Sequence, residues 1–177
     1  MRVLKGKRWY GVLGASILAM LIAASVAIAV ASSISATGGG PITRVKVVRS
    51  NEATATRSTT YVTVPGATTW IHVPAGQTAL ILARFSAESG CNGGLHGTRC
   101  SIRILIGGGV GAPRTGRGFA FDTDTARNDG LESHSMDRSR VLGSGTYRVR
   151  VQYAVTDSLT RFRLDDWSLT VERSRRS

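Results

Sequence analysis

Apolar and polar residues alternate along most of the chain from Ile42 onward. A period of two is typical of β-strands that bury one face and expose the other. The clearest run, residues 146–155, has Tyr147, Val149, Val151, Tyr153 and Val155 on one face and Thr146, Arg148, Arg150 and Gln152 on the other. The same alternation predicts strands at residues 78–88 and 102–106, and shorter ones at residues 44–49, 60–64, 69–73, 118–121 and 132–141.

Turn residues separate these runs. They are Pro65-Gly66, Pro74-Ala75-Gly76, Gly107-Gly108-Gly109 and Gly143-Ser144-Gly145. We expect them to close antiparallel hairpins, and no later segment shows the period of a capped helix. The sequence therefore predicts an all-β domain, an antiparallel two-sheet sandwich of roughly eight or nine strands that is jelly-roll-like, with an open barrel as the alternative.

The first 43 residues break the alternation. Arg2, Lys5, Lys7 and Arg8 precede an uncharged run over residues 9–43, of which residues 11–31 are almost wholly apolar or small. The order of basic, apolar and small residues, ending in Ala29-Val30-Ala31, is typical of a secretory signal peptide. The apolar run also approaches the roughly 20 residues that span a bilayer as a helix. We therefore expect an N-terminal hydrophobic helix over residues 1–31, either a signal peptide cut after Ala31 or an uncut membrane anchor.

Both interpretations place the rest of the chain outside the cytoplasm, secreted or held at the membrane by residues 11–31. Residues 32–41 are rich in Ser, Thr and Gly and are expected to form a flexible linker. Residues 42–177 are enough for one β-sandwich domain with its own core.

The chain is basic, with 23 Lys and Arg against 11 Asp and Glu. The leader holds four of these cations, so 19 remain against 11 acids, a net charge of +8. Such a charge favours anionic partners. An exported protein is a poor partner for nucleic acid, and no basic stretch is interleaved with aromatic residues. An anionic wall polymer, a glycan or another protein fits better.

The candidate binding residues are the exposed strand arginines Arg84, Arg103, Arg148 and Arg150. Arg173, Arg175 and Arg176 are instead expected to form a solvated terminus.

Cys91 and Cys100 are the only cysteines. Oxidising conditions outside the cytoplasm predict a disulfide between them. The segment that they enclose is rich in turn residues, so the bond is expected to close a hairpin loop. A loop of this size contributes about 2 to 3 kcal/mol on the chain-entropy model. Zinc is disfavoured because Cys91, Cys100 and His96 lack a fourth ligand.

One loop carries oxygen ligands of the kind that calcium prefers. They belong to Asp122, Asp124, Asn128 and Asp129. Their spacing is not that of an EF-hand, and Asp and Asn are also ordinary turn residues, so a solvated loop is the favoured interpretation and calcium the alternative.

Two histidines are candidates for chemistry. Glu132 and His134 share one face of a polar strand, an arrangement in which a carboxylate can orient a general base. An edge strand protected by polar residues explains the same pair without catalysis and is favoured. His72 alternates with its apolar neighbours and is expected to be an exposed strand residue.

The last strand changes phase at Asp165 and Asp166. Phe162 and Leu164 share one parity, and Trp167, Leu169 and Val171 share the other. This predicts a β-bulge, which either turns the strand or presents paired carboxylates as a site; we favour the structural role.

The sequence contains no Gly-x-Ser-x-Gly or His-Glu-x-x-His motif and predicts no cofactor. The leading interpretation is an exported, non-enzymatic β-sandwich that acts at the cell envelope as a binding or structural module. The alternatives are a secreted hydrolase that uses paired carboxylates and an inert, oligomerising envelope protein.

Short segments between residues 74 and 172 also carry a resemblance. They are Phe85-Ser86-Ala87-Glu88-Ser89, Cys100-Ser101-Ile102, Gly145-Thr146-Tyr147 and Leu164-Asp165-Asp166-Trp167-Ser168-Leu169. They resemble uncharacterised exported proteins of high-GC, actinobacterial-type bacteria, which implies a β-sandwich and no particular activity. The hairpin entries Pro74-Ala75-Gly76 and Gly145-Thr146-Tyr147-Arg148-Val149 are similar, at the level of the fold, to jelly rolls of the C1q and tumour-necrosis-factor type.

Overall fold

A computed structural model describes residues 37–114, 119–124 and 130–176. The predicted N-terminal helix and signal peptide lie outside the described residues. The described residues contain no helical segment that could span a bilayer. The compact unit from Gly38 to Ser177 is built from strands, which confirms the all-β prediction.

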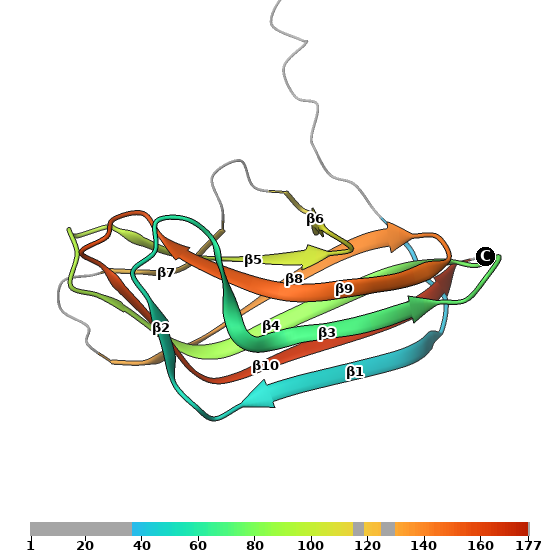
Figure 1. Cartoon of the computed structure of the whole chain (residues 1–177), viewed down its shortest axis with the longest axis horizontal. Coiled ribbons are helices and arrows are strands. Elements are labelled where there is room, and N and C mark those ends of the chain that lie inside the picture. Colours follow the sequence, from blue (N-terminus) through green and yellow to red (C-terminus); the bar gives the residue numbers. More distant parts are fainter. Residues whose placement is uncertain (1–36, 115–118, 125–129, 177) are drawn as a thin grey trace, which may run out of the picture. The chain divides into compact units, whose positions relative to one another are not determined.

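Two antiparallel sheets pack face to face (Figure 1). Sheet A has the order β1 (Ile42–Ser50), β10 (Arg161–Arg176), β4 (Thr78–Asn92) and β8 (Glu132–Leu142), and β2 (Thr54–Thr56) also pairs with β10. Sheet B has the order β3 (Val62–Val73), β9 (Gly145–Val155), β5 (Arg99–Ile106) and β6 (Gly109–Val110), and β7 (Phe119–Thr123) also pairs with β5. The polar strand β8 ends sheet A, as expected of an edge strand.

Strands from the two halves of the chain pair in a nested way. β1 pairs with β10, β3 with β9, β4 with β8 and β5 with β7. This is the winding of a jelly roll, in agreement with the sequence. The predicted hairpins are mostly wrong, because only Gly107-Gly108 joins neighbouring strands of one sheet, β5 and β6. The turns after β3 and β8 cross from one sheet to the other, because turn residues specify a reversal of the chain and not the strand that it pairs with.

The core lies between the sheets, and the buried residues are those that the alternation predicts to point inward. The inward faces of β4, β5 and β9 are buried at the expected positions, except that Tyr147 at the start of β9 is only partly buried. A chain of aromatic rings crosses the core. Phe85 lies 6.2 Å from Trp167 and 5.9 Å from Phe121, and Phe162 lies 6.4 Å from Phe121, measured between ring centroids. These contacts join β4, β7 and β10 and so tie sheet A to sheet B.

The disulfide between Cys91 and Cys100 is present, as predicted. It does not close a hairpin, because Cys91 is on β4 of sheet A and Cys100 on β5 of sheet B. Both half-cystines are buried, at 3% and 0% exposure. The bond therefore joins the two sheets where the chain crosses between them.

Two irregularities shape the long strands. The register of β10 slips between Asp165 and Ser168, which confirms the predicted bulge, and Asp166 has a positive φ of 40°. A second slip between Thr63 and Thr68 lies in β3. It contains Pro65-Gly66, so the two strands predicted there form one bent strand. Gly66 has a φ of 75°, and a Cβ on it would lie 3.3 Å from the Trp167 ring.

Residues 38–40, at the end of the predicted linker, lie against β10. The Gly40 amide donates to the Arg175 carbonyl oxygen at 2.7 Å, and a Cβ on Gly39 would approach Ser174 Oγ to 2.4 Å. The absence of side chains on these glycines thus allows the chain to pass close to the end of β10. Residues 32–36 lie outside the described part.

Candidate functional site

Charge is distributed unequally between the two sheets. Strands β3, β5, β6 and β9, all of which the structure describes in full, contain four arginines and no Asp or Glu. The strands of sheet A contain six of the eleven acidic residues, Glu88, Glu132, Asp137, Asp165, Asp166 and Glu172. The strands of sheet A also contain eleven Lys and Arg, and β7 of sheet B contains Asp122. The difference between the sheets is therefore not one of net charge: β3, β5, β6 and β9 carry arginines with no acid on the same strands.

Strand register assembles an outer surface of sheet B from β3 and β9. Trp70 lies directly opposite Arg148, His72 opposite Thr146, and Thr68 opposite Arg150. Residues opposite each other in a sheet share a face. The intervening residues Ile71 and Val149 are buried in the core, so the Trp70 and Arg148 side chains lie on the outer face. Trp70 is 55% exposed, the most solvent-exposed aromatic residue of the described core strands.

β5 continues the same surface on the other side of β9. Arg103 lies opposite Gln152 and donates from Nε to its Oε1 at 2.8 Å. The Arg103 guanidinium also stacks over the Tyr61 ring, 4.1 Å from the centroid. A stacked and hydrogen-bonded arginine keeps its position, whereas the side chains of Arg148 and Arg150 make no ion pair or hydrogen bond to any described residue. We call Tyr61, Trp70, Arg103, Arg148 and Arg150 the arginine face.

Three of the four predicted binding arginines thus meet on one surface, and the fourth does not. Arg84 is on β4 of sheet A, where its Nε donates to Asp137 Oδ1 at 2.8 Å. Both side chains are about half exposed, and such a surface pair has little net energy. Alternation alone indicates that a residue points outward, but it does not reveal to which sheet the residue belongs.

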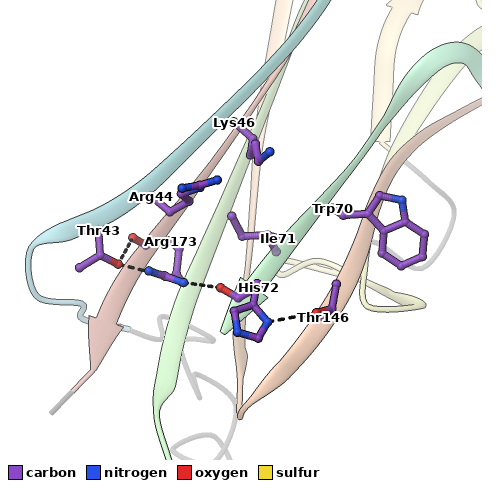
Figure 2. A pocket seen from close by; sticks show the side chains of 8 residues that line it. All are labelled: Thr43, Arg44, Lys46, Trp70, Ile71, His72, Thr146 and Arg173. Carbon is purple, nitrogen blue, oxygen red and sulfur yellow. Dashed lines mark hydrogen bonds between the residues drawn. The ribbon is translucent and has the colours of Figure 1, made fainter. Parts of the chain in front are cut away.

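A groove lies beside this face, between the edge strands β1 and β3 (Figure 2). Its volume is about 340 Å³. It is lined by Thr43, Arg44, Lys46, Trp70, Ile71, His72, Thr146 and Arg173, and we call it the edge groove. Trp70, His72 and Thr146 connect it to the arginine face, so the two features form one continuous surface.

Hydrogen bonds fix two side chains of the edge groove. Arg173 donates from Nε to Thr43 Oγ1 at 2.9 Å and from a terminal nitrogen to the His72 carbonyl oxygen. His72 Nδ1 lies 3.0 Å from Thr146 Oγ1. His72 is exposed, as predicted. Arg173 belongs to β10 and is only partly exposed, so the prediction of a solvated terminus is wrong for this residue.

Sequence reasoning did not select Trp70, Tyr61, Arg44, Lys46 or Arg173 as binding residues. Trp70 alternates with the buried Ile71, and this signal could have identified an exposed aromatic residue. Arg44 and Arg173 lie 129 positions apart in the chain and meet only because β1 pairs with β10. No local pattern could have brought them together.

The Glu132 and His134 pair gains two partners in the structure. Ser89 Oγ donates to Asp122 Oδ2 at 2.8 Å and lies 2.9 Å from His134 Nδ1, while His134 Nε2 lies 3.9 Å from Glu132 Oε2. Ser89 has an exposure of 0%, so its hydroxyl is out of reach of a substrate. The cluster joins β4 and β8 of sheet A to β7 of sheet B, which is a structural role.

The candidate calcium ligands are only partly described. The Asp122 carboxylate accepts hydrogen bonds from Ser89 and from the Thr123 amide, and Asp124 Oδ2 accepts from the Gly94 amide at 2.9 Å. Asn128 and Asp129 lie outside the described residues. The described part contains no cluster of three or more His, Cys, Asp or Glu that could hold a metal. Calcium therefore stays a prediction.

The two aspartates of the β10 bulge have different surroundings. Asp165 Oδ2 accepts a hydrogen bond from Arg163 at 2.6 Å, and the Asp165 side chain is only 16% exposed. Asp166 is exposed and lines a depression together with Arg49 and Ser168. The ion pair engages one of the two carboxylates, in keeping with the structural interpretation of the bulge.

One arginine of sheet A lies inside the sandwich. Arg138 on β8 is 6% exposed, and its guanidinium lies 4.9 Å from the centroid of the Phe119 ring. Burial lowers the pKa of Arg138, and the neighbouring Asp137 carboxylate partly opposes that shift. An arginine remains charged at neutral pH all the same, so this residue is a buried cation that packs under β7.

Comparison with known proteins identifies no family for this chain. No protein-family model matches the sequence, and no curated protein matches it. Among solved structures, the chain is similar to a family 35 carbohydrate-binding module from Clostridium thermocellum, at a TM-score of 0.34 and 15% identity, over 72% of this chain and 97% of the module.

Two further likenesses are of the same kind. Dimeric latent PorU from Porphyromonas gingivalis matches at a TM-score of 0.36 and 11% identity, over 79% of this chain and 14% of PorU. A chain of infectious bursal disease virus, Gx strain, matches at 0.32 and 11% identity, over 85% of this chain and 42% of the viral one. At such scores none of the three identifies a ligand or a family for this chain.

Proposed function

We propose that the chain is an exported, non-enzymatic β-sandwich that binds an anionic polymer or glycan of the cell envelope with the arginine face. The observation that carries the proposal is an outer face built from strands that hold arginines and no acid. Strands β3, β5, β6 and β9 hold no acid, β5 and β9 hold four arginines, and the exposed Trp70 of β3 lies opposite Arg148. A surface of one sign raises the local concentration of oppositely charged ligands.

The individual side chains suit such a ligand. Arg148 and Arg150 offer planar forks of N–H donors that match carboxylate or phosphate groups. Trp70 provides a flat apolar surface with a polar N–H, on which the apolar side of a sugar ring can pack. Neither arginine has to leave a carboxylate partner among the described residues before it binds.

Export is supported by the leader and by the disulfide. Basic residues, an apolar run and Ala29-Val30-Ala31 follow one another as in a signal peptide. The bond between Cys91 and Cys100 is of a kind that persists in oxidising compartments. A location at the envelope would bring the domain close to anionic polymers.

Retention on insoluble cell-wall material tests the proposal. We expect the protein to be retained at low salt and released at high salt, because screening shortens the range of charge interactions to about 3 Å at 1 M. The variant Arg148→Ala/Arg150→Ala should lose retention at low salt. Its matched control is Arg175→Ala/Arg176→Ala, which removes the same charge from the exposed end of β10. Equal loss in both variants would show a response to net charge and refute a specific face.

A further inference from the structure

The edge groove brings cations together without a carboxylate to balance them. Arg44 on β1 lies directly opposite Arg173 on β10. Like charges opposite each other in a sheet are destabilising. Lys46 lies on the same face of β1 as Arg44, about 7 Å along the strand. None of the eight lining residues is Asp or Glu. The groove is therefore a place where the fold retains electrostatic repulsion that a bound anion would relieve.

The three cations differ in how they are held. Arg173 is fixed by Thr43 Oγ1, which accepts from its Nε and donates to its backbone carbonyl oxygen, and by the His72 carbonyl oxygen. The side chains of Arg44 and Lys46 make no hydrogen bond or ion pair to a described residue. Figure 2 shows their side chains on the same side of the groove as Arg173, above the segment of β3 that carries Ile71 and His72. One cation is thus positioned in advance and two are available to close on a ligand.

The donors in the groove favour one kind of anion. Arg44, Lys46 and Arg173 come from two strands and can donate from several directions, so they can contact more than two oxygens of one anion. A phosphate offers three or more such oxygens, whereas a carboxylate offers two. The 340 Å³ volume corresponds to roughly ten water molecules. The groove therefore has room for a phosphate and part of the unit that carries it.

We infer that the edge groove is a phosphate-binding subsite, built from Arg44, Lys46 and Arg173, and that the envelope polymer bound by the arginine face carries phosphate groups. The second half of this inference rests on the proposed function, and the first half does not. Trp70 belongs to both surfaces, and His72 and Thr146 of the groove lie next to it and to Arg148 along β3 and β9, so a polymer chain can pass from one surface to the other.

The test is an NMR titration of the ¹⁵N-labelled full-length chain in a non-ionic detergent with inorganic phosphate, at constant ionic strength. We expect saturable shifts of the Thr43, Lys46 and His72 amides and a dissociation constant at least ten-fold lower than for glucuronate. Glycerol 3-phosphate and dimethyl phosphate, added separately, distinguish a phosphate monoester from a phosphodiester. The variant Arg44→Ala/Lys46→Ala should abolish saturation, and Arg175→Ala/Arg176→Ala should not.

Equal affinity for glucuronate, shifts that follow ionic strength alone, or unchanged phosphate binding in the groove variant would overturn the subsite. An unaltered spectrum of the core amides shows that the groove variant is folded. Retention on cell-wall material is a separate readout. If wild-type protein binds phosphate in the groove but is not retained, the proposed function fails and the subsite stands. If it is retained through Arg148 and Arg150 without binding phosphate, the subsite fails alone.

Discussion

Removal of the bond between Cys91 and Cys100 should lower stability by a predictable amount. The two residues are nine positions apart. For a closed loop of about ten residues, the chain-entropy model gives about 2.7 kcal/mol at 25 °C. Domains of this kind are stable by only about 5 to 15 kcal/mol in total. The bond therefore accounts for a large share of the stability.

Two perturbations separate the cross-link from packing. Reduction breaks the bond but leaves both sulfur atoms in the core, so it should lower the free energy of unfolding by about 2.7 kcal/mol. The variant Cys91→Ala/Cys100→Ala also removes two buried sulfur atoms. We expect it to lose about 1 kcal/mol more for each of them.

The assay is urea unfolding of the oxidised, reduced and doubly substituted proteins, with tryptophan fluorescence as the probe. Trp167 is 3% exposed and lies in the core, so its emission reports unfolding. A loss below about 1 kcal/mol on reduction would refute the reasoning, because it would mean that the cross-link barely restricts the unfolded chain.

Further predictions concern charge, the polar cluster and processing. Arg44→Glu should raise the free energy of unfolding by about 0.2 to 1 kcal/mol, because residue 44 then forms an opposite-charge pair with Arg173 in place of a like-charge pair. Urea unfolding measures the gain. The control Arg161→Glu, at a position that faces Asn92, should not show it. Ser89→Ala should lower stability by about 1 to 3 kcal/mol, because the buried hydroxyl links two sheets; a loss within measurement error in the same assay would contradict that role. Mass spectrometry of protein from culture medium should find an N-terminus at Ser32, and a chain that keeps residues 1–31 in the membrane fraction would favour the anchor instead.

The fold was largely predictable because strands with one buried face leave a clear period in the sequence. The bulge at Asp165 and Asp166 was predictable for the same reason, since an extra residue reverses the parity of Trp167, Leu169 and Val171. The points at which the chain crosses from one sheet to the other could not be predicted. A turn such as Pro74-Ala75-Gly76 has the same composition whether the next strand pairs in the same sheet or packs in the opposite one.

The candidate site was predictable only in part. The outward direction of Arg103, Arg148 and Arg150 follows from alternation, and the structure places them on one sheet. Their meeting with Trp70 on a face whose strands hold no acid depends on strand order, which local sequence does not encode. The opposition of Arg44 and Arg173 depends on the pairing of the first strand with the last.

The fluorescence of Trp70 tests the central claim most directly, because this residue lies on the arginine face at 55% exposure. Its emission is obtained as the difference between the wild-type protein and Trp70→Phe, with and without solubilised wall polymer. Binding at this face should shift the difference spectrum to shorter wavelength and protect it from acrylamide quenching at low salt but not at high salt. Unchanged emission and quenching under conditions in which the polymer is bound would place the ligand elsewhere and contradict the account.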